Sequence, residues 1–145
     1  PSRRFFLYSI IVGATGTGLQ LATWLIDAGS EVTLIDVSET KCRSVDRQLG
    51  SITIVGDPTV VDTLSRSGIE RADILITTLA SDDANLLISS VAKIVFNTSQ
   101  VISVLNTSEN KNIFSIMGVD EIIDSVKLIS ENIEENIADL LIEEV

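Results

Sequence analysis

The stretch that decides the fold runs from Ile10 to Ala22 and reads IIVGATGTGLQLA. A run of branched apolar residues leads through a glycine turn into apolar residues at helical spacing, which predicts a buried strand followed directly by a helix. Gly13 and Gly18 are in register with the first and third glycines of the GxGxxG fingerprint. Thr15 stands at the middle position of that fingerprint, and an additional glycine follows at Gly16.

A loop with this sequence can still hold phosphate. Gly13 permits the tight turn, and Gly18 lets the following helix lie close to the sheet. Backbone N–H groups and the positive end of the helix dipole then point to one spot, where the hydroxyls of Thr15 and Thr17 can add donors. The alternative is a tight strand-to-helix turn that binds nothing.

An acid at the end of the next predicted strand favours the binding interpretation. The segment EVTLID ends in Asp36, 18 residues beyond Gly18. A carboxylate at that position accepts hydrogen bonds from both ribose hydroxyls and disfavours a 2′-phosphate. Taken alone, Asp36 could equally be an acid that interacts with the N-terminal end of the following helix. Together with the loop it predicts an unphosphorylated adenosine compound such as NAD, ADP or ATP, rather than NADP.

Apolar runs alternate with amphipathic stretches along the whole chain, a pattern typical of repeated βαβ units. The predicted strands are 5-12, 31-36, 52-55, 73-77, 101-105 and 121-124. The predicted helices are 17-28, 39-48, 59-67, 82-96, 109-117 and 126-142, the third beginning with Thr59 and Asp62 as a capping box. Right-handed crossovers give an α/β fold, a Rossmann-like, doubly wound parallel sheet of six strands in the order 3-2-1-4-5-6.

Within this single domain we expect residues 1-125 to form the nucleotide-binding part and residues 126-145 a terminal amphipathic helix. Its apolar residues recur at helical spacing: Leu128, Ile129, Ile133, Ile137, Leu140, Leu141 and Ile142. The helix either packs on its own sheet or docks on a second copy or a following domain. In the first helix, Trp24 has helical spacing from Leu21 and Ala28, and we expect it in the core.

Composition excludes several classes of function. A formal charge of −11 makes nucleic acid an unlikely partner. The chain has no histidine and one cysteine, Cys42, so it lacks a Cys/His metal cage and a Ser/His or Cys/His catalytic pair. We expect Cys42 to be a small apolar filler in a reducing, cytoplasmic setting. No apolar run reaches the ~18 residues of a membrane span, so no direct membrane insertion is expected.

Two chemical alternatives are weaker. GATGTG is similar to the glycine loop of short-chain dehydrogenases, NAD-dependent oxidoreductases that use a tyrosine and a lysine one helical turn apart. The one tyrosine, Tyr8, has no lysine four residues on, so we expect no enzyme. The acids Asp82 and Asp83 suit the first turn of a helix, and those of the final helix suit a solvated face, so no metal site is predicted.

Several later stretches resemble the RCK domain family, also called the KTN or Trk N-terminal domain. They are Ser51–Thr59 (SITIVGDPT), Gly68–Thr78 (GIERADILITT) and Asp82–Leu87 (DDANLL). Single residues continue the match at Leu64, Ile102, Asn106, Phe114, Gly118, Val119, Asp120 and Ile123. The likeness covers about residues 9 to 130, nearly the entire chain.

This resemblance implies a nucleotide-binding regulator of a membrane potassium channel or transporter, located on the cytoplasmic side of the membrane. It implies a homodimer or a higher ring, in which the terminal helix crosses to a partner. The family's ligand contacts match Gly13, Thr15, Gly16, Thr17 and Gly18 in the loop, Asp36 at the ribose, Asp57, Pro58 and Thr59 beside the adenine, Thr78, Leu79 and Ala80 over the phosphates, and Asn85 in the next helix.

The sequence departs from the family pattern at the outer phosphates. Many nucleotide-sensing members carry one arginine in the first loop and another on the fifth strand, where this chain has Gly16 and Val104. Each lost charge-assisted contact removes about 1.5–3 kcal/mol of binding free energy. We therefore expect NAD or ADP to bind at least as well as ATP. The remaining alternative is an assembly scaffold with a degenerate site that binds no nucleotide.

Overall fold

The computed structural model describes residues 6–142 of the chain. The strands are β1 (Tyr8–Val12), β2 (Glu31–Asp36), β3 (Thr53–Val55), β4 (Ile74–Thr77), β5 (Gln100–Leu105) and β6 (Glu121–Asp124). The α-helices are α1 (Gly16–Asp27), α2 (Glu39–Leu49), α3 (Val61–Arg66), α4 (Asp82–Ile94), α5 (Lys111–Ile116) and α6 (Ser125–Ile142). Residue 5 of the predicted first strand and residues 143–145 at the end of the chain lie outside the described residues.

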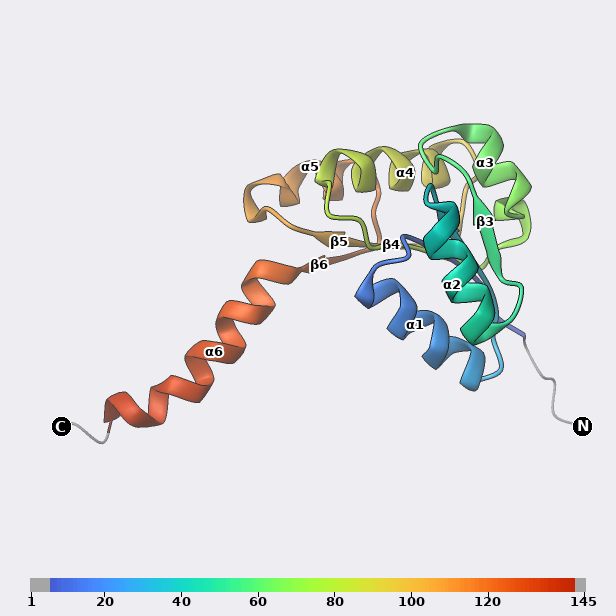
Figure 1. Ribbon diagram of the computed structural model, residues 1–145. Helices are drawn as coiled ribbons and strands as arrows, with labels where there is room; N and C mark the ends of the chain where they lie inside the picture. The colour runs from blue at the N-terminus through green and yellow to red at the C-terminus, as the bar shows by residue number, and fades with distance from the viewer. Residues whose placement is uncertain (1–5, 143–145) are drawn as a thin grey trace, which may run out of the picture.

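The strands form one parallel sheet in the order β3-β2-β1-β4-β5-β6, which confirms the predicted topology. Helices α1 and α2 lie on one face of the sheet, and α3, α4 and α5 lie on the other (Figure 1). The chain reverses direction across the sheet between β1 and β4, which are neighbours although two strands separate them in sequence. In doubly wound sheets, ligands bind at the carboxyl ends of the strands at this point.

The core lies on both faces of β1, whose five residues are all buried. Ile10 and Val12 pack with Leu75 and Ile88 under α4, while Ile11 packs with Leu25 under α1. The sequence of a strand that is covered on both faces is a continuous apolar run, which is why the residues IIV predicted a buried strand. This buried strand fixes the position of the glycine loop that follows it.

The start of α3 differs from the predicted capping box. The helix begins at Val61 after Val60, which has no side chain able to cap it. The hydroxyl of Thr59 instead donates to Oδ1 of Asp57 over 2.6 Å, in a turn that precedes the helix. A local hydrogen bond between neighbouring side chain and backbone groups competes with helix capping for the same hydroxyl, and here it moves the helix start by two residues.

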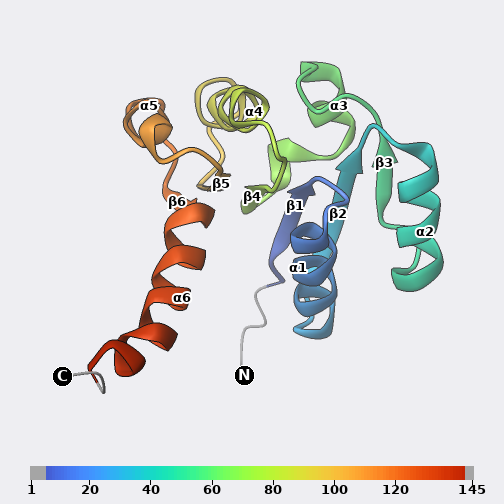
Figure 2. The same ribbon diagram turned by 60° about the vertical axis from the view of Figure 1, so that its left-hand side comes forward.

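The terminal helix extends away from the body of the domain in two views (Figures 1 and 2). All side chains from Val126 to Leu141 are exposed, so packing of α6 on its own sheet is not observed. Trp24 was expected in the core, but 64% of it is exposed because α6 does not cover the sheet beside α1. Between residues 6 and 142, no helix combines the length and apolar character that a membrane crossing requires.

Candidate nucleotide-binding site

The glycine loop connects β1 to α1 with almost no spare room. Gly13 has φ +112°, and its N–H donates to the carbonyl of Ile35 over 2.8 Å. A Cβ on Gly13 would lie 2.6 Å from Oγ1 of Thr78, and a Cβ on Gly18 would collide with the backbone carbonyl of Gly13. The close packing that both glycines were predicted to allow is therefore present.

Thr15 replaces the middle glycine of the fingerprint and caps α1. Its hydroxyl accepts the N–H of Gly18 over 3.0 Å and lies 2.8 Å from the hydroxyl of Thr78. The Thr15 hydroxyl, expected as a phosphate donor, is thus used within the protein. Within residues 6–142 the N–H groups of Gly16 and Thr17 have no partner, and both residues are exposed. These free donors at a helix N-terminus can bind an anion.

Asp36 lies directly across from the loop, at the carboxyl end of β2. Its Oδ2 accepts the N–H of Ala14 and its Oδ1 accepts the N–H of Ser38, both over 2.8 Å. The residue is 9% exposed. Because each carboxylate oxygen has two acceptor sites, both oxygens can still accept a hydroxyl from a ribose. The two backbone contacts fix the orientation of the carboxylate beside the loop.

A cavity of about 160 Å³ opens beside Asp36. Its lining residues are Ile35, Asp36, Val37, Asp57, Pro58, Thr59, Leu79 and Ala84. Five of the predicted site residues thus come together from three separate segments. Ile35, Val37 and Ala84 were not predicted as site residues, although the positions of Ile35 and Val37 on either side of Asp36 could have suggested them. The lining is mostly apolar with a few oxygen acceptors, which is the composition expected for the base and ribose of a nucleoside.

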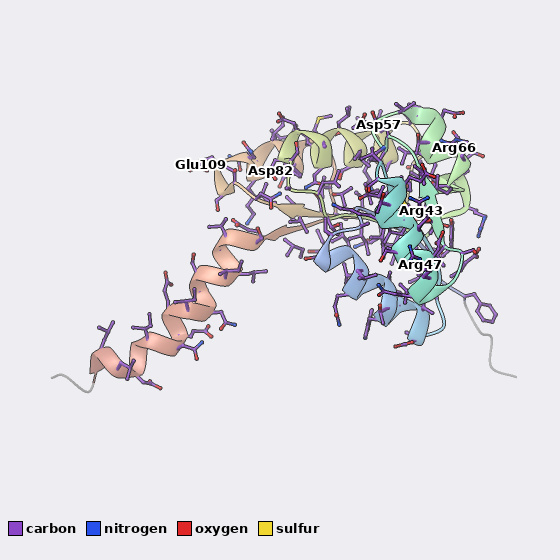
Figure 3. All side chains as sticks on the ribbon, viewed as in Figure 1. Arg43, Arg47, Asp57, Arg66, Asp82 and Glu109 are labelled. Carbon is purple, nitrogen blue, oxygen red and sulfur yellow. The ribbon has the colours of Figure 1, made fainter. Side chains whose placement is uncertain are left out.

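The charges at the site are negative. None of the lining residues is basic. Arg43 and Arg47 lie on α2 and Arg66 lies on α3, as Figure 3 shows. The Thr59 hydroxyl and, second, the Thr59 N–H donate to Asp57 and lower the pKa of its carboxyl. The glycine loop therefore offers backbone donors for a diphosphate, and neither Gly16 in the loop nor Val104 on β5 supplies a cation for a third phosphate.

The turn after β4 lies between the glycine loop and the cavity. The hydroxyl of Thr78 donates to the carbonyl of Val12 over 2.9 Å, and Leu79 lines the cavity. Ala80 is exposed and lies outside the lining. Asn85, predicted as a ligand contact, is fully buried, and its amide bonds the N–H and carbonyl of Leu79 and the carbonyl of Val104. Its role in this structure is to position the turn.

Asp82 lies in the first turn of α4, as the sequence predicted, and it also makes long-range hydrogen bonds that the sequence did not indicate. It begins α4 and lies beside the β5–α5 loop that carries Glu109 (Figure 3). It accepts the N–H groups of Asn106 and Thr107 and the amides of Asn106 and Asn110. Burial alone would raise the pKa of Asp82, but these hydrogen bonds together lower it. Within residues 6–142, no three acidic, cysteine or histidine side chains converge in a way that could hold a metal.

Curated proteins similar in sequence to this chain include potassium uptake proteins of the Trk system. The Trk system potassium uptake protein TrkA homolog of Methanothermobacter thermautotrophicus is 29% identical over 141 residues, which cover 94% of this chain and 65% of the relative. The chain therefore spans less than two thirds of that relative's length.

Solved structures share the fold. The TrkA-N domain of the inner membrane protein ybaL from Escherichia coli superposes with a TM-score of 0.82 at 17% identity, covering 90% of this chain and 96% of that one. GsuK bound to ADP superposes with a TM-score of 0.77 at 24% identity, covering 90% and 33%. The GsuK channel bound to NAD gives a TM-score of 0.79 at 22% identity, covering 96% and 24%.

The family model of the TrkA-N domain matches residues 9–125, which include the glycine loop, Asp36, the cavity and the turn after β4. This match confirms the resemblance to the RCK, KTN or Trk N-terminal domains that the sequence motifs predicted. The chain belongs to the TrkA-N domain family.

Proposed function

We propose that this chain is the nucleotide-binding regulatory domain of a potassium channel or transporter, located at the cytoplasmic face of the membrane. Occupancy of its site by NAD or ADP changes the relative arrangement of two paired domains, and the membrane partner responds to that change. Such a ligand acts only through unequal affinity for the two arrangements. The family and the ligands named for GsuK support this proposal.

The observation that carries the proposal is the cavity beside Asp36. It unites a ribose acceptor, an apolar lining and the GDPT turn, and the glycine loop places free N–H groups nearby. The test is thermal unfolding with NAD, NADH, ATP, ADP and AMP. A ligand that binds only the folded state at 100 times its Kd stabilises it by about 2.7 kcal/mol, which raises the melting temperature.

The competing function is an assembly scaffold without a ligand. It is favoured by the Thr15 hydroxyl, which bonds Gly18 and Thr78 instead of remaining free. The same unfolding measurement separates the two functions, because a scaffold shows no shift with any of the nucleotides at millimolar concentration.

We further propose that the chain is not an enzyme. Tyr8, the tyrosine that a dehydrogenase mechanism would need, is the first residue of β1 and so lies at the opposite end of the strand from the glycine loop. Its hydroxyl is bonded to Thr33 and to the carbonyl of Ser67. A group so placed cannot exchange a proton with a substrate at the carboxyl edge of the sheet.

The first prediction concerns the phosphate preference. ADP is expected to bind at least as tightly as ATP, because Gly16 in the loop and Val104 on β5 supply no cationic side chain for a third phosphate. Gly16→Arg should raise ATP affinity over ADP by about tenfold, the effect of one charge-assisted contact. A Cβ at Gly16 meets nothing within 4 Å, so the substitution fits the structure. Isothermal titration calorimetry gives both affinities, with Gly16→Gln as the uncharged control.

A wild-type protein that binds ATP tenfold more tightly than ADP would contradict this prediction. Equal effects of Gly16→Arg and Gly16→Gln would show that side-chain length, not charge, changes the affinity.

A second copy of the chain is the partner that we propose for α6. A groove of about 420 Å³ lies beside α1, on the face of β4 and β5 opposite α4, and its lining includes Trp24, Ile76 and Ile102. The apolar side chains of α6 are exposed in the same chain. Reciprocal docking of two such helices would cover both surfaces in an isologous dimer.

The second prediction tests that dimer. Ile133 is 53% exposed, so Ile133→Ala removes apolar contact area without disturbing the domain. The dimer Kd is expected to rise by about tenfold, since an isoleucine side chain contributes about 1.5 kcal/mol or more on burial. Sedimentation velocity over a concentration series measures it. Glu134→Ala, one residue along the helix, is the control and should leave the Kd unchanged; a similar rise for both variants would refute the proposed face.

A further inference from the structure

We infer that the β5–α5 loop, residues 106–110, transmits nucleotide occupancy to the first turn of α6. This inference rests on the nucleotide site proposed above and adds the route by which that site reaches the terminal helix. The route consists of two sets of hydrogen bonds that the loop backbone joins between Thr107 and Ser108, and it leads from the turn after β4 to the carboxylate that caps α6.

The route begins at Leu79. Its side chain lines the cavity, and its carbonyl accepts the amide of Asn85 over 2.8 Å and the amide of Asn106 over 3.0 Å. Asn106 also donates its N–H to Asp82 over 2.8 Å, and Thr107 donates to the other carboxylate oxygen over 2.9 Å. Bonds to a carboxylate are roughly twice as strong as neutral ones. Because these bonds join Leu79 and Asp82 to Asn106 and Thr107, a shift of Leu79 on ligand binding displaces the start of the β5–α5 loop.

The route ends at Asp124, the last residue of β6. The hydroxyl of Ser108 donates to its Oδ2 over 2.7 Å, and the N–H of Lys127 donates to its Oδ1 over 3.0 Å. Asp124 is 9% exposed. One carboxylate thus holds the loop with one oxygen and the first turn of α6 with the other. Ser125 adds a bond from its hydroxyl to the carbonyl of Leu105 over 3.0 Å.

The exposure of α6 explains why this contact matters. Because every side chain from Val126 to Leu141 is exposed, the packing of the helix on its own domain does not fix its direction. The direction of α6 therefore depends on the groups that hold its first turn, chiefly Asp124. Ser108, in the β5–α5 loop, is bonded to that same carboxylate. Coupling between two sites requires a connection of this kind whose arrangement both sites influence.

The experiment combines ADP titration calorimetry with hydrogen exchange of the wild-type chain and three variants. In the wild type, ADP is expected to bind and to change amide exchange over residues 125–130. Ser108→Ala should keep the ADP affinity within about twofold, because Ser108 lies outside the cavity lining. The ADP-dependent change over residues 125–130 should fall by about tenfold, the effect of one lost hydrogen bond to a carboxylate.

Two controls make the result specific. Thr107→Ala removes a neighbouring hydroxyl and keeps the N–H that bonds Asp82, so it should behave as the wild type. Ser108→Thr keeps the hydroxyl and should restore the ADP-dependent change. Wild-type binding of ADP with an undiminished change in Ser108→Ala would overturn the transmission route while the nucleotide site stands. Failure of the wild type to bind either ADP or NAD in the same calorimetric titrations would overturn the proposed function itself, and the inference with it.

Discussion

Gly18→Ala is expected to lower the free energy of unfolding by about 3 kcal/mol, the upper end of the usual cost of overpacking. The added methyl group would collide with the backbone carbonyl of Gly13. That carbonyl cannot move aside easily, because the N–H of Ala14, which belongs to the same peptide group, is bonded to the carboxylate of Asp36.

Urea unfolding followed by circular dichroism measures this effect, and Gly16→Ala is the matched control. Gly16 lies in the same loop, but a Cβ there meets nothing within 4 Å. Its replacement by alanine should change stability by no more than about 0.5 kcal/mol. Equal stability of the Gly18→Ala and Gly16→Ala proteins would mean that α1 can move away from the sheet at no cost, contrary to the close approach described above.

The strands and their order in the sheet were predictable from the sequence. Parallel strands that helices cover on both faces read as continuous apolar runs, and all six predicted strands are present within two or three residues of their expected bounds. The strand order followed because right-handed crossovers leave few arrangements for such a chain. These are local and topological rules, and they do not depend on which side chains meet.

The position of Trp24 was not predictable in this way. Helical spacing from Leu21 correctly indicated that both residues face the same side, and both line the groove beside α1. Spacing does not reveal whether another element covers that side. The cover is missing in the single chain because α6 extends away, so Trp24 is largely exposed. The error therefore arose from the tertiary arrangement and not from the helix itself.

Some of the predicted site residues meet at one cavity, but the contacts that hold the site together were not predictable. Asp36, the Asp57–Thr59 turn and Leu79 meet at one cavity, as the family motifs implied. The structural roles of Asn85 and Asp82 depend on bonds to Val104, 19 residues away, and to Asn106, 24 residues away. No local pattern encodes such contacts, since an asparagine or aspartate near a helix start fits many roles equally well.

Asp36→Asn is expected to weaken NAD binding by about 30- to 100-fold. The carboxylate can accept both ribose hydroxyls, and each such bond to a charged group contributes about 1.5–3 kcal/mol. An amide keeps one acceptor oxygen without the charge, so most of that free energy is lost. Titration calorimetry with NAD and NADP measures the change. The amide can accept a hydrogen bond from only one of the N–H groups of Ala14 and Ser38, so the variant is less stable than the wild type. The titrations are therefore carried out well below the melting temperature of the variant.

The comparison with NADP separates a ligand contact from a merely structural role. In the wild type, the buried charge of Asp36 should repel a 2′-phosphate, so NAD binds far more tightly than NADP. In Asp36→Asn the repulsion disappears, and the ratio of the two affinities should fall by about tenfold or more. A carboxylate that only braced the loop through Ala14 and Ser38 would weaken both ligands equally. An unchanged ratio would therefore place the ribose away from Asp36, whatever the size of the loss in affinity.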